Sequence, residues 1–205
     1  MTISKGSPWG APGVLPAGGV VVRSDASARA ALEAARVARS PYPALGLLGG
    51  DLCRTVGGTG AEARLHDGTG TVLPVDLGSA LVDGRVHLFV AHAVVRGRSL
   101  WRGRVVAAMN AQFVGRWDVA PKAHPGDALL DVVSVEPAMG VGERWKARSR
   151  LATGTHVPHP RISVRRVDAV QLDGEGQRLW LDGVEVGPFH TLSLRVEPDA
   201  LTVVV

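Results

Sequence analysis

The pattern of hydrophobic and polar positions changes about one third of the way along the chain. In the first part, the β-branched run Gly19–Arg23 precedes an alanine-rich segment, Ala26–Arg39, with suitable N-cap residues at Ser24 and Asp25. The pattern therefore predicts a short strand followed by a helix, which Pro41 ends.

The next two elements repeat that order. Ala44–Leu48 is a short apolar run of the kind that forms a buried strand, and a short helix is predicted over Asp51–Val56. Strand, helix, strand and helix in succession predict one βαβ unit with a parallel strand pair.

From about Leu65 onward, short apolar runs are separated by Asp-Gly pairs. Asp-Gly between two such runs is a strong signal for a tight hairpin, because both turn residues must accept positive φ. The predicted strands are Arg64–Leu65, Thr71–Leu77, Ser79–Val82, Arg85–Val90, Val167–Leu172, Arg178–Leu181 and Thr191–Val196. The predicted turns are Asp67-Gly68, Asp83-Gly84, Asp173-Gly174 and Asp182-Gly183.

This organisation predicts an α+β protein with two parts. Residues 1–64 form a small βαβ unit, and residues 65–205 form a larger antiparallel β-sandwich or barrel. Hydrophobic residues make up 45% of the 205 residues and charged residues 20%, which is typical of a globular chain.

The single cysteine, Cys53, has no internal partner for a disulfide, which favours the reducing cytoplasm. The longest apolar stretch, His87–Val95, is too short for a membrane span.

Basic residues are concentrated in one segment. The net charge is 23 − 19 = +4, whereas Val141–Val170 alone carries +5. Such a patch attracts anionic lipid head groups, phosphates or nucleic acid, unless it is an ordinary solvated face. Around Trp145 the basic residues are closely spaced, which predicts a basic edge strand or helix face able to meet an anionic membrane surface. They are Arg144, Lys146, Arg148 and Arg150.

Several ordered segments resemble one family. Pro121-Lys-Ala-His-Pro-Gly-Asp-Ala-Leu-Leu-Asp131-Val-Val resembles the Pro-Asp-Ala-x-x-Asp-Asp-Gly-Leu-Leu-Asp-Val-Val segment of bacterial diacylglycerol kinases and sphingosine-type lipid kinases. Further similar stretches are Met109–Gly115, His156–Pro160, Leu179–Gly183 and Glu197–Val205. Upstream, Ala44–Gly57 is similar to a family strand and glycine loop. The resemblance implies a lipid-kinase-like C-terminal β domain preceded by a remnant of the nucleotide domain.

The resemblance also implies roles for particular residues. Asp182 matches the general base that takes a proton from the lipid hydroxyl, although Asp182-Gly183 also reads as a simple turn. Asp127 matches a carboxylate linked to Mg²⁺, or it is a solvated loop residue. The residues that match nucleotide-binding positions are Gly49, Gly50, Asp51 and Asn110. ATP and Mg²⁺ are the cofactors implied if the chain is a kinase.

The chain departs from the family at its phosphate-binding loop. Val22–Ala28 stands where the family has Gly-Gly-Asp-Gly-Thr, and alanine side chains hinder close approach of backbone N–H groups to phosphate. The favoured hypothesis is therefore a pseudokinase that binds a lipid, a phosphate or a protein partner.

Two alternatives remain open. The first is an active phosphotransferase that moves the ATP γ-phosphate to a lipid hydroxyl, with a homo- or hetero-oligomer completing the nucleotide domain. The second is a basic nucleic-acid-binding module. That reading is less favoured, because the chain has only three Phe and one Tyr for base stacking, although five Trp partly compensate. The expected location is the cytoplasm, including the membrane surface.

Overall fold

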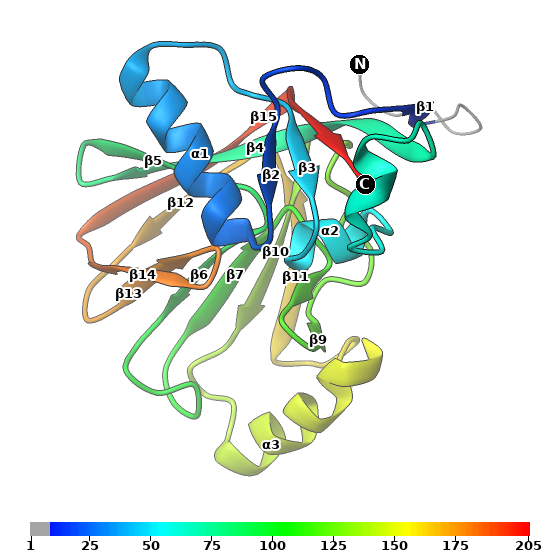
Figure 1. Ribbon diagram of the computed structural model, residues 1–205. Coiled ribbons are helices and arrows are strands. Elements are labelled where there is room, and N and C mark those ends of the chain that lie inside the picture. The colour runs from blue at the N-terminus through cyan, green and yellow to red at the C-terminus, as the bar shows by residue number, and fades with distance from the viewer. Residues whose placement is uncertain (1–8) are drawn as a thin grey trace.

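The computed structural model describes residues 9–205, which form two β-sheets with helices at their margins (Figure 1). The helices are α1 (Asp25–Ala38), α2 (Asp51–Thr55), η1 (Glu62–Leu65), α3 (Val141–Arg150) and η2 (Leu151–Thr153). The strands are β1 (Ala11–Gly13), β2 (Val20–Val22), β3 (Leu45–Leu47), β4 (Gly70–Val82), β5 (Arg85–Phe89), β6 (His92–Arg96), β7 (Val105–Met109), β8 (Phe113–Val114), β9 (Trp117–Asp118), β10 (Leu130–Val135), β11 (Ile162–Val167), β12 (Ala169–Asp173), β13 (Arg178–Leu181), β14 (Val184–Pro188) and β15 (Thr191–Val204). None of the helices in the described part of the chain is long and apolar enough to cross a membrane.

The strands form a β-sandwich of two main sheets. Sheet A has the order β1-β4-β15-β3-β2, with β5 beside β4 and β12 beside β15. Sheet B has the order β11-β10-β7-β6-β13-β14, and every neighbouring pair in it is antiparallel. The predicted α+β class with an antiparallel sandwich is confirmed.

The N-terminal elements follow the prediction closely. The Ser24 hydroxyl accepts the Ser27 N–H, which caps α1, and Arg39 ends the helix in the left-handed conformation. Strands β2 and β3 are parallel, as predicted. Strand β3 also pairs in parallel with β15, so both parts of the chain contribute to sheet A. The division of the chain after residue 64 stays a prediction.

Two of the four Asp-Gly pairs form the predicted hairpins. Asp83-Gly84 joins β4 to β5 and Asp182-Gly183 joins β13 to β14, with positive φ at all four residues. The other two predictions were wrong. Before Asp67-Gly68, Arg64–Leu65 belongs to the 3₁₀ helix η1, and the Asp67 carboxylate accepts the Thr69 N–H in a local turn. Asp173-Gly174 lies between β12 of sheet A and β13 of sheet B, so it connects the two sheets.

Sheet B is apolar on both faces. Leu130 and Val132 of β10 are buried in the core between the sheets. Val133 and Val135 of the same strand face outward, where they pack in a cluster with Met139 and part of α3. In Figure 1 α3 lies at the far end of the molecule from α1. The outer face of sheet B is therefore a second hydrophobic surface, separate from the central core.

Candidate functional site

The outer face of sheet B forms the floor of an apolar pocket. Val94 of β6, Ala107 of β7 and Val133 of β10 lie side by side across three strands. In the next row, Val105 lies opposite Val135. Ala107 has the smallest side chain in this floor, and larger neighbours surround it, so the face is hollow at its centre.

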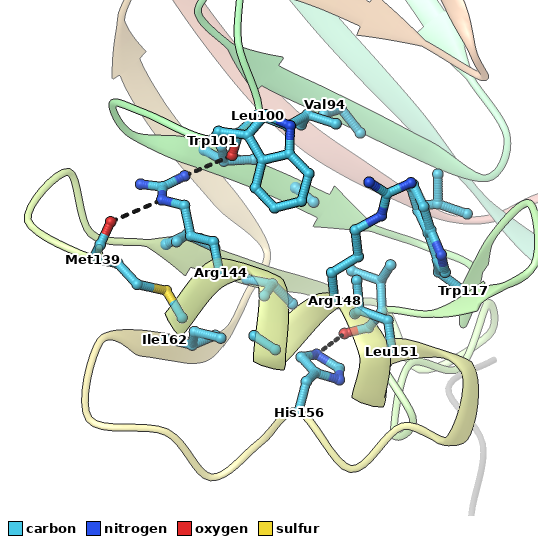
Figure 2. Close-up of a pocket in the computed structure, with 17 residues that line it drawn as sticks. Val94, Leu100, Trp101, Trp117, Met139, Arg144, Arg148, Leu151, His156 and Ile162 are labelled. Atoms are coloured by element: carbon cyan, nitrogen blue, oxygen red, sulfur yellow. Dashed lines mark hydrogen bonds between the residues drawn. The ribbon is translucent and has the colours of Figure 1, made fainter. Parts of the chain in front are cut away.

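Helix α3 and its continuation cover this floor (Figure 2). Ala147 and Leu151 contribute from the helix side, opposite the sheet, while Met139 and Ile162 close one side. The cavity has a volume of about 180 Å³, and its lining is almost wholly apolar. Such a concave apolar site is suited to an alkyl chain.

Arg144 attaches α3 to the loop that follows β6. It is only 5% exposed, and its guanidinium donates to the backbone carbonyls of Met139, Leu100, Gly103 and Glu136. Four of the five N–H donors of Arg144 are thus used within the chain, which argues against a role in binding a phosphate or lipid head group. The assignment of Arg144 to an anion-binding patch stays a prediction, and the basic residues around Trp145 lie on a helix rather than on an edge strand.

Arg148 lies at the mouth of the pocket, one turn further along α3. Its guanidinium carbon is 5.4 Å from the ring centroid of Trp101 and 5.2 Å from that of Trp117 (Figure 2). Among residues 9–205 it has no hydrogen-bond or ion-pair partner. Lys146 and Arg150 are exposed on the same helix but do not line the cavity.

His156 adds a buried polar group to the lining. Its imidazole is 3% exposed, and its Nε2–H donates to the Val119 carbonyl. Burial lowers the pKa of this ring, so it is neutral at neutral pH. Nδ1 then carries a lone pair, and it has no partner within the described part of the chain.

Apart from the apolar pocket, a polar region lies where β13 ends. The buried carboxylate of Asp182 accepts three backbone N–H groups, from Val90, Ala91 and His92. Burial raises the pKa of Asp182 to about 6, although the His92 charge and these hydrogen bonds oppose the shift.

His92 connects this aspartate to α2. Its Nε2 lies 3.1 Å from an Asp51 carboxylate oxygen, which also accepts the Gly115 N–H. Burial opposes charge on both partners. The hydrogen bond and the neighbouring carboxylates, Asp182 among them, still raise the pKa of His92, and the bonds from His92 and Gly115 lower the pKa of Asp51. Both shifts favour the charged forms and so favour an ion pair between His92, which is buried, and Asp51, which is half-buried.

Asp25 closes the same region from the start of α1. Its carboxylate accepts the N–H groups of Asp51 and Leu52, the first two residues of α2. Burial raises its pKa even though these two bonds oppose the shift. A carboxylate of the chain itself thus occupies the helix end where an anion would otherwise be attracted.

The residues predicted to bind nucleotide pack against the chain itself. A Cβ on Gly50 would lie 2.5 Å from an Asp25 oxygen, and one on Gly49 would lie 2.6 Å from the Arg23 carbonyl. Asn110 is fully buried, and its amide donates to the carbonyls of Asp76 and Val90. Of the predicted set, Asp51, Asn110 and Asp182 all contact the segment Val90–His92, and Gly49 and Gly50 directly precede Asp51, while Arg148 lies at the pocket.

The residues present do not fit a magnesium site at Asp127. One of its carboxylate oxygens pairs with Arg166, and the other accepts the Leu129 N–H. Within residues 9–205, no group of three or more His, Cys, Asp or Glu side chains is placed to hold a metal ion.

The hairpin β8–β9 touches both regions. The Gly115 N–H at its turn donates to Asp51, and Arg54 stacks on Phe113 at 3.7 Å. Val114 and Trp117 of the same hairpin line the apolar pocket. The polar region and the pocket are therefore neighbours joined by one short element.

Sequence reasoning missed the pocket and three of the residues that define it: Ala107, Trp101 and Trp117. A signal was present in the apolar run Val105–Met109, which is continuous rather than alternating and so indicates a strand buried on both faces.

Comparison with known proteins decides the family. Residues 80–205 match the family described as the YegS C-terminal NAD kinase beta sandwich-like domain. The chain belongs to this family.

Membership in the YegS C-terminal domain family confirms the lipid kinase resemblance. The structure is similar to a candidate diacylglycerol kinase from Bacillus anthracis str. Sterne, with a TM-score of 0.61, 13% identity, and coverage of 79% of this chain and 69% of that chain. Another structure of such a protein from the same organism gives a TM-score of 0.58, 14% identity, and the same coverage. These identities establish a shared fold. No curated protein matches this chain.

Proposed function

We propose that the chain is a lipid-binding member of the lipid kinase family that does not itself transfer phosphate. The observation that carries this proposal is the apolar pocket between sheet B and α3, with its hollow floor at Ala107 and its open mouth at Arg148. Its small volume favours one narrow alkyl chain over a bulky ring system. In this proposal residues 65–205 hold the lipid, and residues 1–64 are a remnant of a nucleotide domain.

The polar region supports the same proposal, because its binding groups are already paired within the chain. The Asp25 carboxylate takes the N–H groups that begin α2, so they are not free to bind phosphate. Asp127 is paired with Arg166 and does not fit a metal ion. Phosphoryl transfer depends on a phosphate cradle and a metal, and these residues supply neither.

A specific observation favours the alternative of an active phosphotransferase. The pKa of Asp182 near 6, beside His92, suits a group that accepts a proton. Against this role, all three hydrogen bonds to the Asp182 carboxylate come from the chain's own backbone. A partner subunit would have to provide the nucleotide loop.

We also propose that the end of the molecule around the pocket mouth docks on an anionic membrane. Large apolar side chains are exposed there: Leu100 by 43%, Val141 by 52% and Trp145 by 64%. They lie on α3 and the adjoining loop, beside Lys146, Arg148 and Arg150. Exposed apolar anchors next to basic residues are the usual composition of an interfacial surface.

Filling the pocket tests the lipid-binding proposal. Ala107→Phe places a ring in the hollow of the floor and should weaken binding of 1-monododecanoylglycerol at least about tenfold, measured by calorimetry below the micelle concentration. The matched control is Val164→Phe. Val164 lies opposite Val133 on the outer face of sheet B, but it does not line the cavity.

The control should bind the probe like the parent chain, and thermal unfolding should show both variants folded. Equal binding by parent and Ala107→Phe would contradict the pocket as the lipid site. Micromolar affinity for ATP with Mg²⁺ in the same calorimeter would contradict the non-catalytic proposal and favour the phosphotransferase.

A further inference from the structure

The unused donors of Arg148 suggest which lipid the pocket takes. Arg144 and Arg148 are four residues apart and so lie on the same face of α3. The four carbonyls around Arg144 use its donors, whereas the guanidinium of Arg148 makes no hydrogen bond or ion pair within residues 9–205. The guanidinium of Arg148 is therefore free to donate hydrogen bonds to an anionic group of a ligand.

Two tryptophans hold this cation at the pocket mouth. Trp101 and Trp117 both lie within cation–π distance of the guanidinium, at 5.4 and 5.2 Å (Figure 2). Stacking on aromatic faces leaves the in-plane N–H groups of a guanidinium free to donate. The side chain is therefore positioned before any ligand arrives, which lowers the entropy lost on binding.

The lining of the pocket offers Arg148 no carboxylate partner within residues 9–205. None of the pocket-lining residues in the described part of the chain is acidic. The carboxylate of Glu143 on the same helix already accepts the Gly140 N–H and lies 3.7 Å from Arg161. A planar guanidinium binds carboxylate and phosphate groups with two parallel hydrogen bonds.

We infer that the pocket takes an amphiphile with a single alkyl chain and an anionic head group, and that Arg148 binds the carboxylate or phosphate of that head. This inference rests on the proposed lipid-binding function. The alkyl chain of this amphiphile lies over Ala107, and its head group remains at the pocket mouth between Trp101 and Trp117.

Four ligands with the same twelve-carbon chain and different heads test the inference: dodecanoate, dodecyl phosphate, dodecanol and dodecyltrimethylammonium. Binding to the full chain is measured by calorimetry at low salt, below each micelle concentration. Both anions should bind about tenfold more tightly than dodecanol, and the ammonium ligand should bind most weakly. The relative affinities of dodecanoate and dodecyl phosphate distinguish a carboxylate from a phosphate head.

The variant Arg148→Met keeps an unbranched apolar stem but removes the charge. It should lose the tenfold advantage of the anions and bind dodecanol within about twofold of the parent. Arg150→Gln is the matched control, because it removes an exposed charge of the same helix that does not line the pocket. The control should keep the preference for anions, and Arg148→Lys should keep part of it.

The outcomes distinguish failure of the head-group assignment from failure of the proposed lipid-binding function. If dodecanol and the anions bind equally, or if Arg148→Met still prefers anions, the head-group assignment is overturned while lipid binding stands. If none of the four ligands binds, the proposed function itself fails.

Discussion

The polar region and the apolar pocket differ in whether the chain satisfies its own binding groups. Around Asp182 and Asp51, carboxylate oxygens meet backbone N–H groups and His92, all supplied by the chain. At the pocket, the floor around Ala107 is hollow, and Arg148 has no hydrogen-bond or ion-pair partner among the described residues. A group already paired internally contributes to folding, whereas an unpaired group beside a cavity is available to a ligand. Polar clusters alone are therefore a poor guide to candidate binding sites in this molecule.

The largest expected effect tests the structural role of Asp182. Asp182→Ala removes the acceptor of three buried N–H groups, so the free energy of unfolding should fall by at least about 4 kcal/mol. Urea unfolding measures this loss.

Asp83→Ala is a matched control, because Asp83 also begins an Asp-Gly hairpin with positive φ and accepts the N–H groups of His190 and Thr191. These groups are exposed, so water replaces the lost acceptor and the free energy of unfolding should fall much less than in Asp182→Ala. Equal losses in the two variants would mean that the Asp182 carboxylate has no special structural role.

A smaller effect should appear when pH is changed. The pKa of Asp182 is raised from 3.8 to about 6 in the folded chain, so folding favours the protonated form. The stability from this group is fully present below pH 4 and is lost as pH rises through 6. Ionisation of Asp182 should therefore lower the free energy of unfolding by about 3 kcal/mol across this range.

Urea unfolding at several pH values between 4 and 7.5 measures how the free energy of unfolding changes with pH. Asp182→Asn should reduce this pH dependence. Asp76 has a pKa raised by burial to about 6 as well, so part of the pH dependence should remain in the single variant and should decrease further when Asp76→Asn is added. Parallel curves for parent and double variant would rule out both groups as its source.

The smallest effect concerns the surface beside the pocket. Changing Lys146, Arg148 and Arg150 to Gln should weaken binding to anionic vesicles by about 2 kcal/mol in total, with little effect on neutral vesicles. The charge-matched control changes Arg39, Arg85 and Arg195, which are exposed on other elements. Vesicle sedimentation at low and physiological salt measures both.

Trp145→Ala separates insertion from charge attraction at this surface. It should weaken vesicle binding even at high salt, because the indole is an apolar anchor that salt does not screen. A parent chain that ignores anionic vesicles at low salt would exclude membrane docking. Salt-sensitive binding to nucleic acid without vesicle binding would favour the nucleic-acid alternative instead.

Local rules explain which turns the sequence predicted correctly. Asp83-Gly84 and Asp182-Gly183 are hairpins, since in each case the flanking strands pair with each other. Asp173-Gly174 has equally suitable flanks, but β12 pairs with β15 and β13 pairs with β6. The dipeptide sets the local conformation that is available, and distant strands decide whether a hairpin forms.

Arg144 and Arg148 show the same limit at the site. Both are arginines of one basic segment, and nothing in the local sequence separates them. One is buried against carbonyls from Leu100, Gly103, Glu136 and Met139, while the other lies between two tryptophans. Two of these carbonyls and both tryptophans are more than 20 residues away along the chain.

The sequence by itself determined the cap and extent of α1, the parallel pair of β2 and β3, the β-rich remainder and the lipid kinase family. These depend on capping, short apolar runs and ordered motifs, which act over a few residues. The tertiary structure alone decided that Asp25 closes the start of α2, that Arg144 is used internally, and that sheet B and α3 enclose a pocket around Ala107. Each of these contacts joins segments far apart in the chain, and packing, rather than local preference, brings such segments together.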